Sequence, residues 1–243
     1  MDTNKTIRNV LLTVPGMLLC LIGDYCIGLE PKGSKEIGLL ASDGWLTISD
    51  LRIGISNTCG MVGTFLFGIA VYSLISYLRE TNKNNTNKWD NIFLKSFYFS
   101  LCTGCISFIY FHIACGKLIQ SFNVLYDVTG GDIKTSESAL LRLFATEAIP
   151  FVLLLILFDL VATVSWIALV LRKQLKLGKA WILAAPLIST LIGEILEFLP
   201  LPFGGISSGT ETLGWMFMFI GAALHIKRNK QQADTDKATT TNL

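Results

Sequence analysis

The chain has few charged residues for its length. Only 16% of its 243 residues are Asp, Glu, Lys or Arg, and 51% are hydrophobic. About 25% charged residues is usual in a soluble domain. This shortage of charge excludes an ordinary soluble protein, and we expect most of the chain to lie in lipid.

Motifs that would name a reaction are also lacking. The sequence contains no Walker loop, no HExxH and no potassium-filter signature, and the serines of residues 205–209 form no nucleophile elbow. The formal net charge is only +2, and the basic residues form no patch with aromatic residues. We therefore expect no cofactor and no nucleic-acid partner.

Long apolar runs dominate what is present. Six of them approach the roughly 20 residues that a helix needs to cross a hydrocarbon core of about 30 Å. A spanning segment must satisfy its backbone hydrogen bonds internally, so each run is interpreted as a helix. The sequence predicts an all-α, polytopic membrane protein, a bundle of six transmembrane helices. The expected spans are residues 10–28, 53–78, 93–118, 150–171, 180–199 and 210–226.

Lysine and arginine indicate the orientation. Fourteen of the 20 basic residues fall on the side that holds both termini, and six fall on the other. Because basic residues concentrate in cytoplasmic loops, both termini should face the cytoplasm, in a multi-pass protein of the plasma membrane. We expect residues 1–230 to form one domain, and the polar tail 231–243 to be disordered.

Three connections face the outer side. Residues 30–52 are numerous enough to fold over the end of the bundle. Gly130 and Gly131 predict a turn, followed by a short apolar helix in the interface that begins near Thr135 or Ser136. Residues 199–209 make a tight, uncharged connection.

Polar side chains inside the expected spans gather at one level. With alternating helix directions, nearly all of them fall in the outer half, and only Asp159 lies near the midplane. Intramembrane ionisable residues usually face the bundle interior or a wet cavity. We expect an outward-facing, ligand-binding pocket lined by Asp24, Asn57, His112, Asp159, Glu194, Glu197 and Glu211.

The pair Glu194 and Glu197 is the most costly feature. Each acid within an apolar run costs about 3 kcal/mol unless something holds it. With Thr190 and Gly193 the two share one helix face, and His112 and Lys117 are candidate counter-ions. The alternative interpretation is that the acids form ion pairs near the interface that only tie helices together.

Cysteines provide an incomplete set of metal ligands. Cys102 and Cys105 form a CxxC, and Cys115 follows His112 by three residues. Zinc normally needs four ligands, and cysteine is a common small residue of membrane helices. We expect no metal site.

Four local patterns resemble a known family. They are the run Leu21-Ile-Gly-Asp24-Tyr-Cys-Ile-Gly28, the segment from Trp45 to Arg52, the histidine and cysteine pair of the third run, and the late proline-glycine turn. The chain resembles, over residues 8–228, an uncharacterised family of bacterial six-helix integral membrane proteins. This resemblance implies architecture and no catalytic residues.

Three classes of function stay open. The first is a sensor or carrier whose pocket binds a small molecule, a lipid or a proton. The second is a membrane enzyme acting on a lipid or amphiphile, with Glu194 or Glu197 as general acid or base and His112 as its partner. The third is a structural or accessory subunit with a protein partner that the sequence does not identify.

Overall fold

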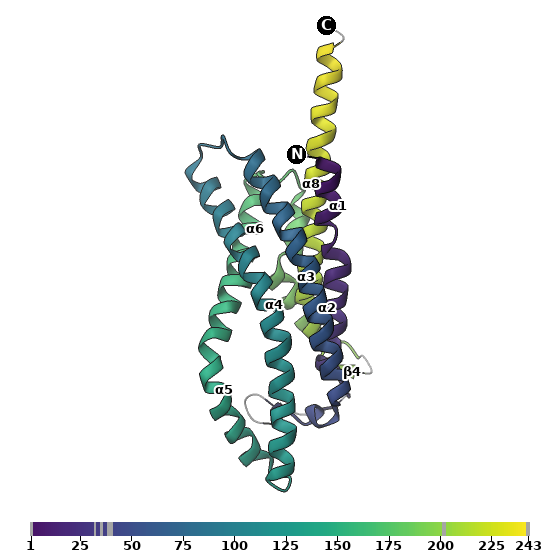
Figure 1. Cartoon of the computed structure of the whole chain (residues 1–243), viewed down its shortest axis with the longest axis vertical. Coiled ribbons are helices and arrows are strands. Elements are labelled where there is room, and N and C mark those ends of the chain that lie inside the picture. Colours follow the sequence, from purple (N-terminus) through teal and green to yellow (C-terminus); the bar gives the residue numbers. More distant parts are fainter. Residues whose placement is uncertain (1, 32, 35, 38–40, 201–202, 242–243) are drawn as a thin grey trace.

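The helices form an elongated bundle with both termini at one end (Figure 1). The computed structural model describes residues 2–31, 33–34, 36–37, 41–200 and 203–241. Lys32 and Lys35, counted above with the outer basic residues, and residues 242–243 of the tail lie outside the described residues. The described chain is 84% helical, so the all-α prediction is confirmed.

The first three helices begin at side-chain caps or at a small break. Asp2 accepts hydrogen bonds from the first turn of α1 (Thr3–Val10), and α2 (Thr13–Gly28) follows after a two-residue break. Ser49 caps α3 (Asp50–Thr81) in the same way. Such caps satisfy amide groups that have no partner within the helix.

α4 (Lys88–Val128) is longer than its expected span. It ends in a turn at Gly130 and Gly131, which have positive φ angles of 67° and 88° that glycine adopts without strain. Asp132 then caps α5 (Ile133–Leu155), and hydrogen bonds from Thr135 lower the pKa of this carboxyl. The paired ends of α4 and α5 project beyond the other helices (Figure 1).

α5 does not stop at the membrane interface, as the sequence prediction had it. It continues through a π-helical turn, η2 (Ile156–Leu160), into α6 (Val161–Leu171). The extra residue of a π turn rotates the chain, and here Phe158 and Asp159 are both buried although they are adjacent. The expected interface helix and the fourth span are therefore one helical segment.

The expected span 180–199 is broken into two helical pieces. They are the 3-10 helix η3 (Lys179–Ala184) and α7 (Pro186–Glu197). Pro186 has no amide hydrogen and disfavours a helical conformation at Ala185, which is extended. The Thr163 hydroxyl of α6 accepts a hydrogen bond of 3.1 Å from the Leu187 amide, so one amide freed at the break is paired.

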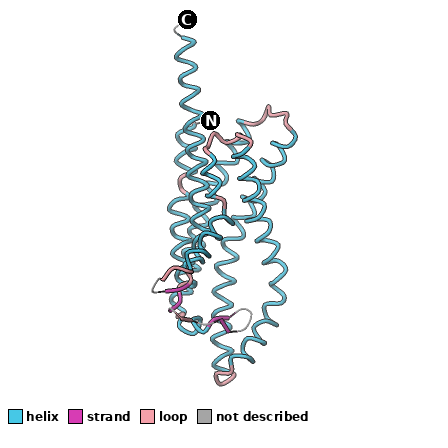
Figure 2. The backbone as a smooth tube through the Cα atoms, turned by 180° about the vertical axis from the view of Figure 1, so that it is seen from behind, coloured by secondary structure: helices cyan, strands magenta, loops and turns pink. Residues whose placement is uncertain are grey.

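The connections at the end away from the termini pair with each other (Figure 2). β1 (Glu30–Pro31) is antiparallel to β4 (Phe203–Gly204), and β2 (Glu36–Ile37) to β3 (Ala41–Ser42). The 3-10 helix η1 (Asp43–Thr47) places Trp45 against Phe122 of α4, with ring centroids 5.9 Å apart. The connection between α2 and α3 therefore packs against the bundle end, as its length predicted.

α8 (Thr210–Thr241) follows the short 3-10 helix η4 (Ile206–Gly209). It continues well past its apolar part and projects from the bundle as a helix (Figure 1). The tail that the sequence predicted to be disordered is thus helical as far as Thr241.

Within the described residues, four helices are long and apolar enough to cross a membrane. They are Thr3–Gly28, Asp50–Thr81, Lys88–Val128 and Ile149–Leu171, and they correspond to the first four expected spans. α7 is too short, and the apolar part of α8 is followed at once by Lys227 and Arg228.

Glycines bring α2 and α3 together. A Cβ atom on Gly63 would overlap the carbonyl oxygen of Gly16 and the Sγ of Cys20. Small residues allow this approach between membrane helices, where there is no hydrophobic driving force to hold a looser contact.

We expect alanine at Gly63 to destabilise the protein by about 1 to 3 kcal/mol, because its methyl group would meet backbone atoms that cannot move away. Gly54 of the same helix has no atom within 4 Å of its Cβ position. G54A should instead raise stability by about 0.5 to 1 kcal/mol, since glycine disfavours a helix. Unfolding midpoints in mild detergent compare the two variants, and equal midpoints would contradict the close approach.

Candidate ligand-binding site

A cavity of about 200 Å³ lies among four helices and η4, near the end of the bundle away from the termini. Three polar side chains that the sequence singled out line it from different helices: Asp24 from α2, His112 from α4 and Glu211 from α8. The other lining residues are Ile27, Phe108, Phe111, Cys115, Phe151, Leu155, Ser208 and Thr212.

His112 occupies a slot between α2 and α3. A Cβ atom on Gly23 or on Gly60 would overlap its imidazole ring, so only glycine leaves room for the ring. The ring is 3% exposed, and its Nδ1 lies 3.3 Å from the Ser56 hydroxyl. Nε2 has no hydrogen-bond partner among the described residues, although Asp24 Oδ1 is 3.6 Å away.

Asp24 connects α2 to α8. The Thr212 hydroxyl donates a hydrogen bond of 2.6 Å to Oδ2, and the side chain of Asp24 is 19% exposed. The carboxyl group is thus held from one side while its other oxygen faces His112. This arrangement fixes the acid at the cavity wall.

A second pair of acids lies against the same wall. Glu211, in the first turn of α8, has its carboxyl group beside that of Asp159 from η2. Trp215 donates to Asp159 Oδ1 at 3.4 Å, and its indole stacks on Phe158 with 4.2 Å between centroids. Apart from the neighbouring carboxyl group of Glu211, Oδ2 of Asp159 has no hydrogen-bond partner in the part of the chain that the structure describes.

The charges around the cavity do not balance. Asp24, Glu211 and the neighbouring Asp159 supply three carboxyl groups, against one imidazole. No lysine or arginine is among the described residues that line the cavity. A buried charge is costly unless it is paired, so this site favours a bound cation or proton.

The remaining predicted residues lie elsewhere. Asn57 is on α3 opposite Gly116, one turn of α4 beyond His112, and does not line the cavity. Glu194 is exposed. Glu197 accepts a hydrogen bond of 2.7 Å from the Ser207 amide and so holds the start of η4.

Lys117, the other expected counter-ion, is also apart from the cavity. It lines a separate groove of about 280 Å³ between α4 and α5. The same groove holds Glu147, whose carboxyl group accepts a 2.8 Å hydrogen bond from Tyr110. Lys117 therefore does not neutralise the acids of the first cavity.

Sequence reasoning missed Thr212 and the aromatic wall. Thr212 directly follows Glu211, and its position next to a predicted site residue was the one feature of the sequence that could have indicated it. Phe108, Phe111 and Cys115 recur at helical spacing with His112 on α4, so they share its face. Phe151 had no comparable signal.

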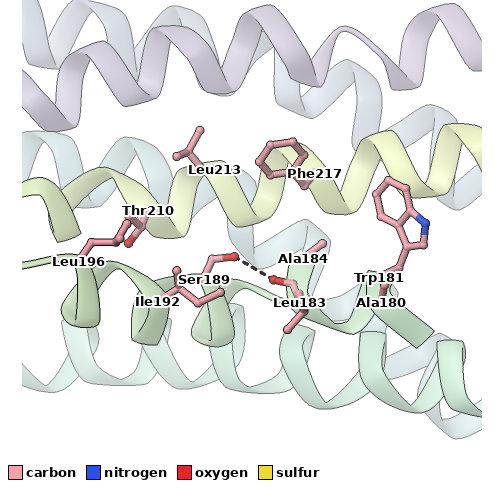
Figure 3. A pocket seen from close by; sticks show the side chains of 10 residues that line it. All are labelled: Ala180, Trp181, Leu183, Ala184, Ser189, Ile192, Leu196, Thr210, Leu213 and Phe217. Atoms are coloured by element: carbon pink, nitrogen blue, oxygen red, sulfur yellow. Dashed lines mark hydrogen bonds between the residues drawn. The ribbon is translucent and has the colours of Figure 1, made fainter. Parts of the chain in front are cut away.

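A larger cavity of about 440 Å³ lies between η3, α7 and α8, and its walls are almost wholly apolar (Figure 3). Ser189, one of its few polar side chains, donates to the Leu183 carbonyl within the wall. The described residues that line this cavity include no charged group, so the cavity offers no counter-charge to a charged ligand.

Cysteine and histidine do not assemble into a metal centre within the described chain. No three His, Cys, Asp or Glu residues there are arranged to hold an ion. All six cysteines are free thiols, including Cys102 and Cys105 of the CxxC.

The fold and the site together define a helical protein with four helices apolar enough to cross a membrane and a buried acid and imidazole cluster. The chain belongs to a family of unknown function (DUF6796), whose model matches residues 1–229. No curated protein and no solved structure matches it. The expected resemblance to an uncharacterised family is confirmed, and the family supplies no functional residues.

We expect T212V to cost about 1 to 3 kcal/mol, because it leaves a partly buried carboxyl oxygen of Asp24 without its donor. The matched control is T58V. The exposed Thr58 hydroxyl bonds only to the Gly54 carbonyl of its own helix, so its loss should change stability little. Denaturation in detergent measures both, and equal losses would show that the bond between α2 and α8 contributes nothing.

Proposed function

We propose that the chain is an integral protein of the plasma membrane that crosses it six times. In this proposal its small cavity opens outward and binds a small molecule, as in a sensor or receptor. The observation that carries the proposal is the cavity itself, where acids from α2 and α8 meet an imidazole nitrogen without a partner.

Six crossings are consistent with the dimensions of the last two segments. η3 and α7, with six and 12 residues, together extend roughly 30 Å, the thickness of a hydrocarbon core. α8 supplies the sixth crossing with its apolar part, 210–226. The two termini lie at the same end of the bundle, as an even number of crossings requires (Figure 1).

The distribution of basic residues supports cytoplasmic termini. The end of the bundle that holds both termini carries 14 of the 20 lysines and arginines, counting the connections from α3 to α4 and from α6 to η3 with the helix ends beside them. Membrane insertion favours this end on the cytoplasmic side. Asp24, close to the end of α2, and Glu211, at the start of α8, then lie in the outer half.

Aromatic side chains close the inner side of the cavity. Phe108 contacts the ring of Phe158 at 4.9 Å between centroids, and Phe158 stacks on Trp215. Phe67 packs behind them, 5.4 Å from Phe108. A carrier needs a polar path to the other side of the membrane. These packed aromatic side chains leave no such path from the cavity, and so favour a binding protein over a carrier.

The enzyme alternative has less support. Ser56, His112 and Asp24 form a chain of polar contacts, but Ser56 is completely buried and does not line the cavity. A nucleophile must reach its substrate. Glu194 and Glu197, the acids first considered for acid and base chemistry with His112, do not line its cavity either. If the chain were only a structural or accessory subunit, the cavity should be closed to water and to small reagents in solution.

Cys115 provides the test, because it is the one described cysteine on the cavity wall. In a variant that retains only Cys115, the neutral reagent hydroxyethyl methanethiosulfonate should form a mixed disulfide with it and release methanesulfinate. A control variant that retains only Cys20, which is fully buried and does not line the cavity, should react about tenfold more slowly. Mass spectrometry follows both rates, and unreactive Cys115 in the folded protein would overturn the proposal.

Orientation is tested with single cysteines in a variant from which the six native ones are removed. Ser34 lies in the connection between α2 and α3, and the exposed Asn84 lies between α3 and α4. An impermeant maleimide should label S34C in intact cells and N84C only after lysis. The opposite labelling pattern would show that the protein has the reverse orientation, with its termini outside the cell.

A further inference from the structure

We infer that the ligand of this cavity is a small organic ammonium cation. The inference deepens the proposed function and rests on it, since it names the chemical class that the same cavity selects. Its basis is the combination of cavity size, aromatic walls and unbalanced acids.

The volume of the cavity sets the size of the ligand. Drug-sized ligands occupy pockets of roughly 300 to 1,000 Å³, and an apolar cavity of about 150 Å³ holds benzene. At about 200 Å³, the cavity has room for a group such as trimethylammonium and not for a lipid chain with its headgroup.

Three phenyl rings form the apolar walls. Phe108 and Phe111 come from α4, and Phe151 faces Phe111 from α5 with 4.8 Å between ring centroids. An alkylated ammonium group is attracted to the faces of such rings, and its methyl groups need no hydrogen bonds. An inorganic cation needs several ligands that converge on one point, and no three His, Cys, Asp or Glu residues of the described chain are arranged to hold an ion.

The polar side of the cavity supplies the counter-charge. The carboxyl groups of Asp24 and Glu211 line it, and no basic side chain among the described lining residues competes for them. His112 adds a nitrogen without a hydrogen-bond partner, which a hydroxyl or N–H group of the ligand would satisfy. An anionic ligand would face two acids and no cation, so this class is excluded.

The experiment compares three reagents on the full chain that retains only Cys115. They are the trimethylammonium-ethyl, hydroxyethyl and sulfonatoethyl methanethiosulfonates, each rate being divided by the rate with a free thiol in solution. The cationic reagent should react about tenfold faster than the anionic one, because acids at a cleft raise the local concentration of cations. Tetramethylammonium chloride should slow the neutral reagent, and sodium chloride at equal concentration should not.

Charge variants assign the preference to the cavity. D24N and E211Q, each in the Cys115 background, should reduce the cation to anion ratio by about threefold or more. D127N removes an exposed carboxyl group of α4 outside the cavity and should leave the ratio unchanged. Unfolding midpoints show which variants remain folded, and D24N and E211Q serve as independent replicates of one another.

The results separate the two proposals. If the neutral reagent does not modify Cys115, the accessible cavity fails and the ligand class fails with it. If the neutral reagent reacts but the cationic reagent has no advantage over the anionic one, the cavity stands and the ammonium inference is wrong. An advantage that D127N reduces as strongly as D24N would also overturn it, because the selectivity would then come from the general surface charge.

Discussion

The close contact of α2 with α3 is the constraint on which the site depends. Where Gly16 meets Gly63 the two backbones touch, and further along the same contact Gly23 and Gly60 leave a slot that the imidazole of His112 fills from α4. Without that slot His112 could not reach Asp24, and three helices would not share one polar centre. The polar cluster therefore assembles only when small residues allow α2 and α3 to pack closely.

The sequence was sufficient to find four helices that are long and apolar enough to cross a membrane, because the length of an apolar run is read directly from the sequence. The sequence was not sufficient to show in which direction around the helix axis each polar side chain points. In the run that holds Glu194 and Glu197, apolar residues cover every face, and Leu191 and Ile195 are exposed. Periodicity therefore could not show that Glu194 is exposed or that Glu197 binds the Ser207 amide.

Backbone irregularities account for the other differences. The π turn of η2 inserts a residue into the helical period, so the inward direction of Asp159 follows from structure and not from spacing. Pro186 is compatible with a break in a helix, yet a proline in the first turn is also an ordinary helix start. The sequence alone therefore did not show that the helix is interrupted at Ala185, where the Thr163 hydroxyl accepts a hydrogen bond from the Leu187 amide. Thr212 was missed because a threonine within a span often bonds only to its own backbone.

The two histidines of the chain differ in how the protein satisfies their ring nitrogens. Both are 3% exposed. His225 has contacts at both ring nitrogens, with the Lys176 amide at 2.9 Å and with Asn229 at 3.1 Å, so its polar atoms are satisfied within the protein. His112 has a contact at Nδ1 alone, and its other nitrogen lies beside a cavity and an acid. Since an unpaired buried polar group carries a cost of about 1 to 3 kcal/mol, a purely structural cluster would resemble that of His225, and the open nitrogen of His112 fits a site completed by a ligand.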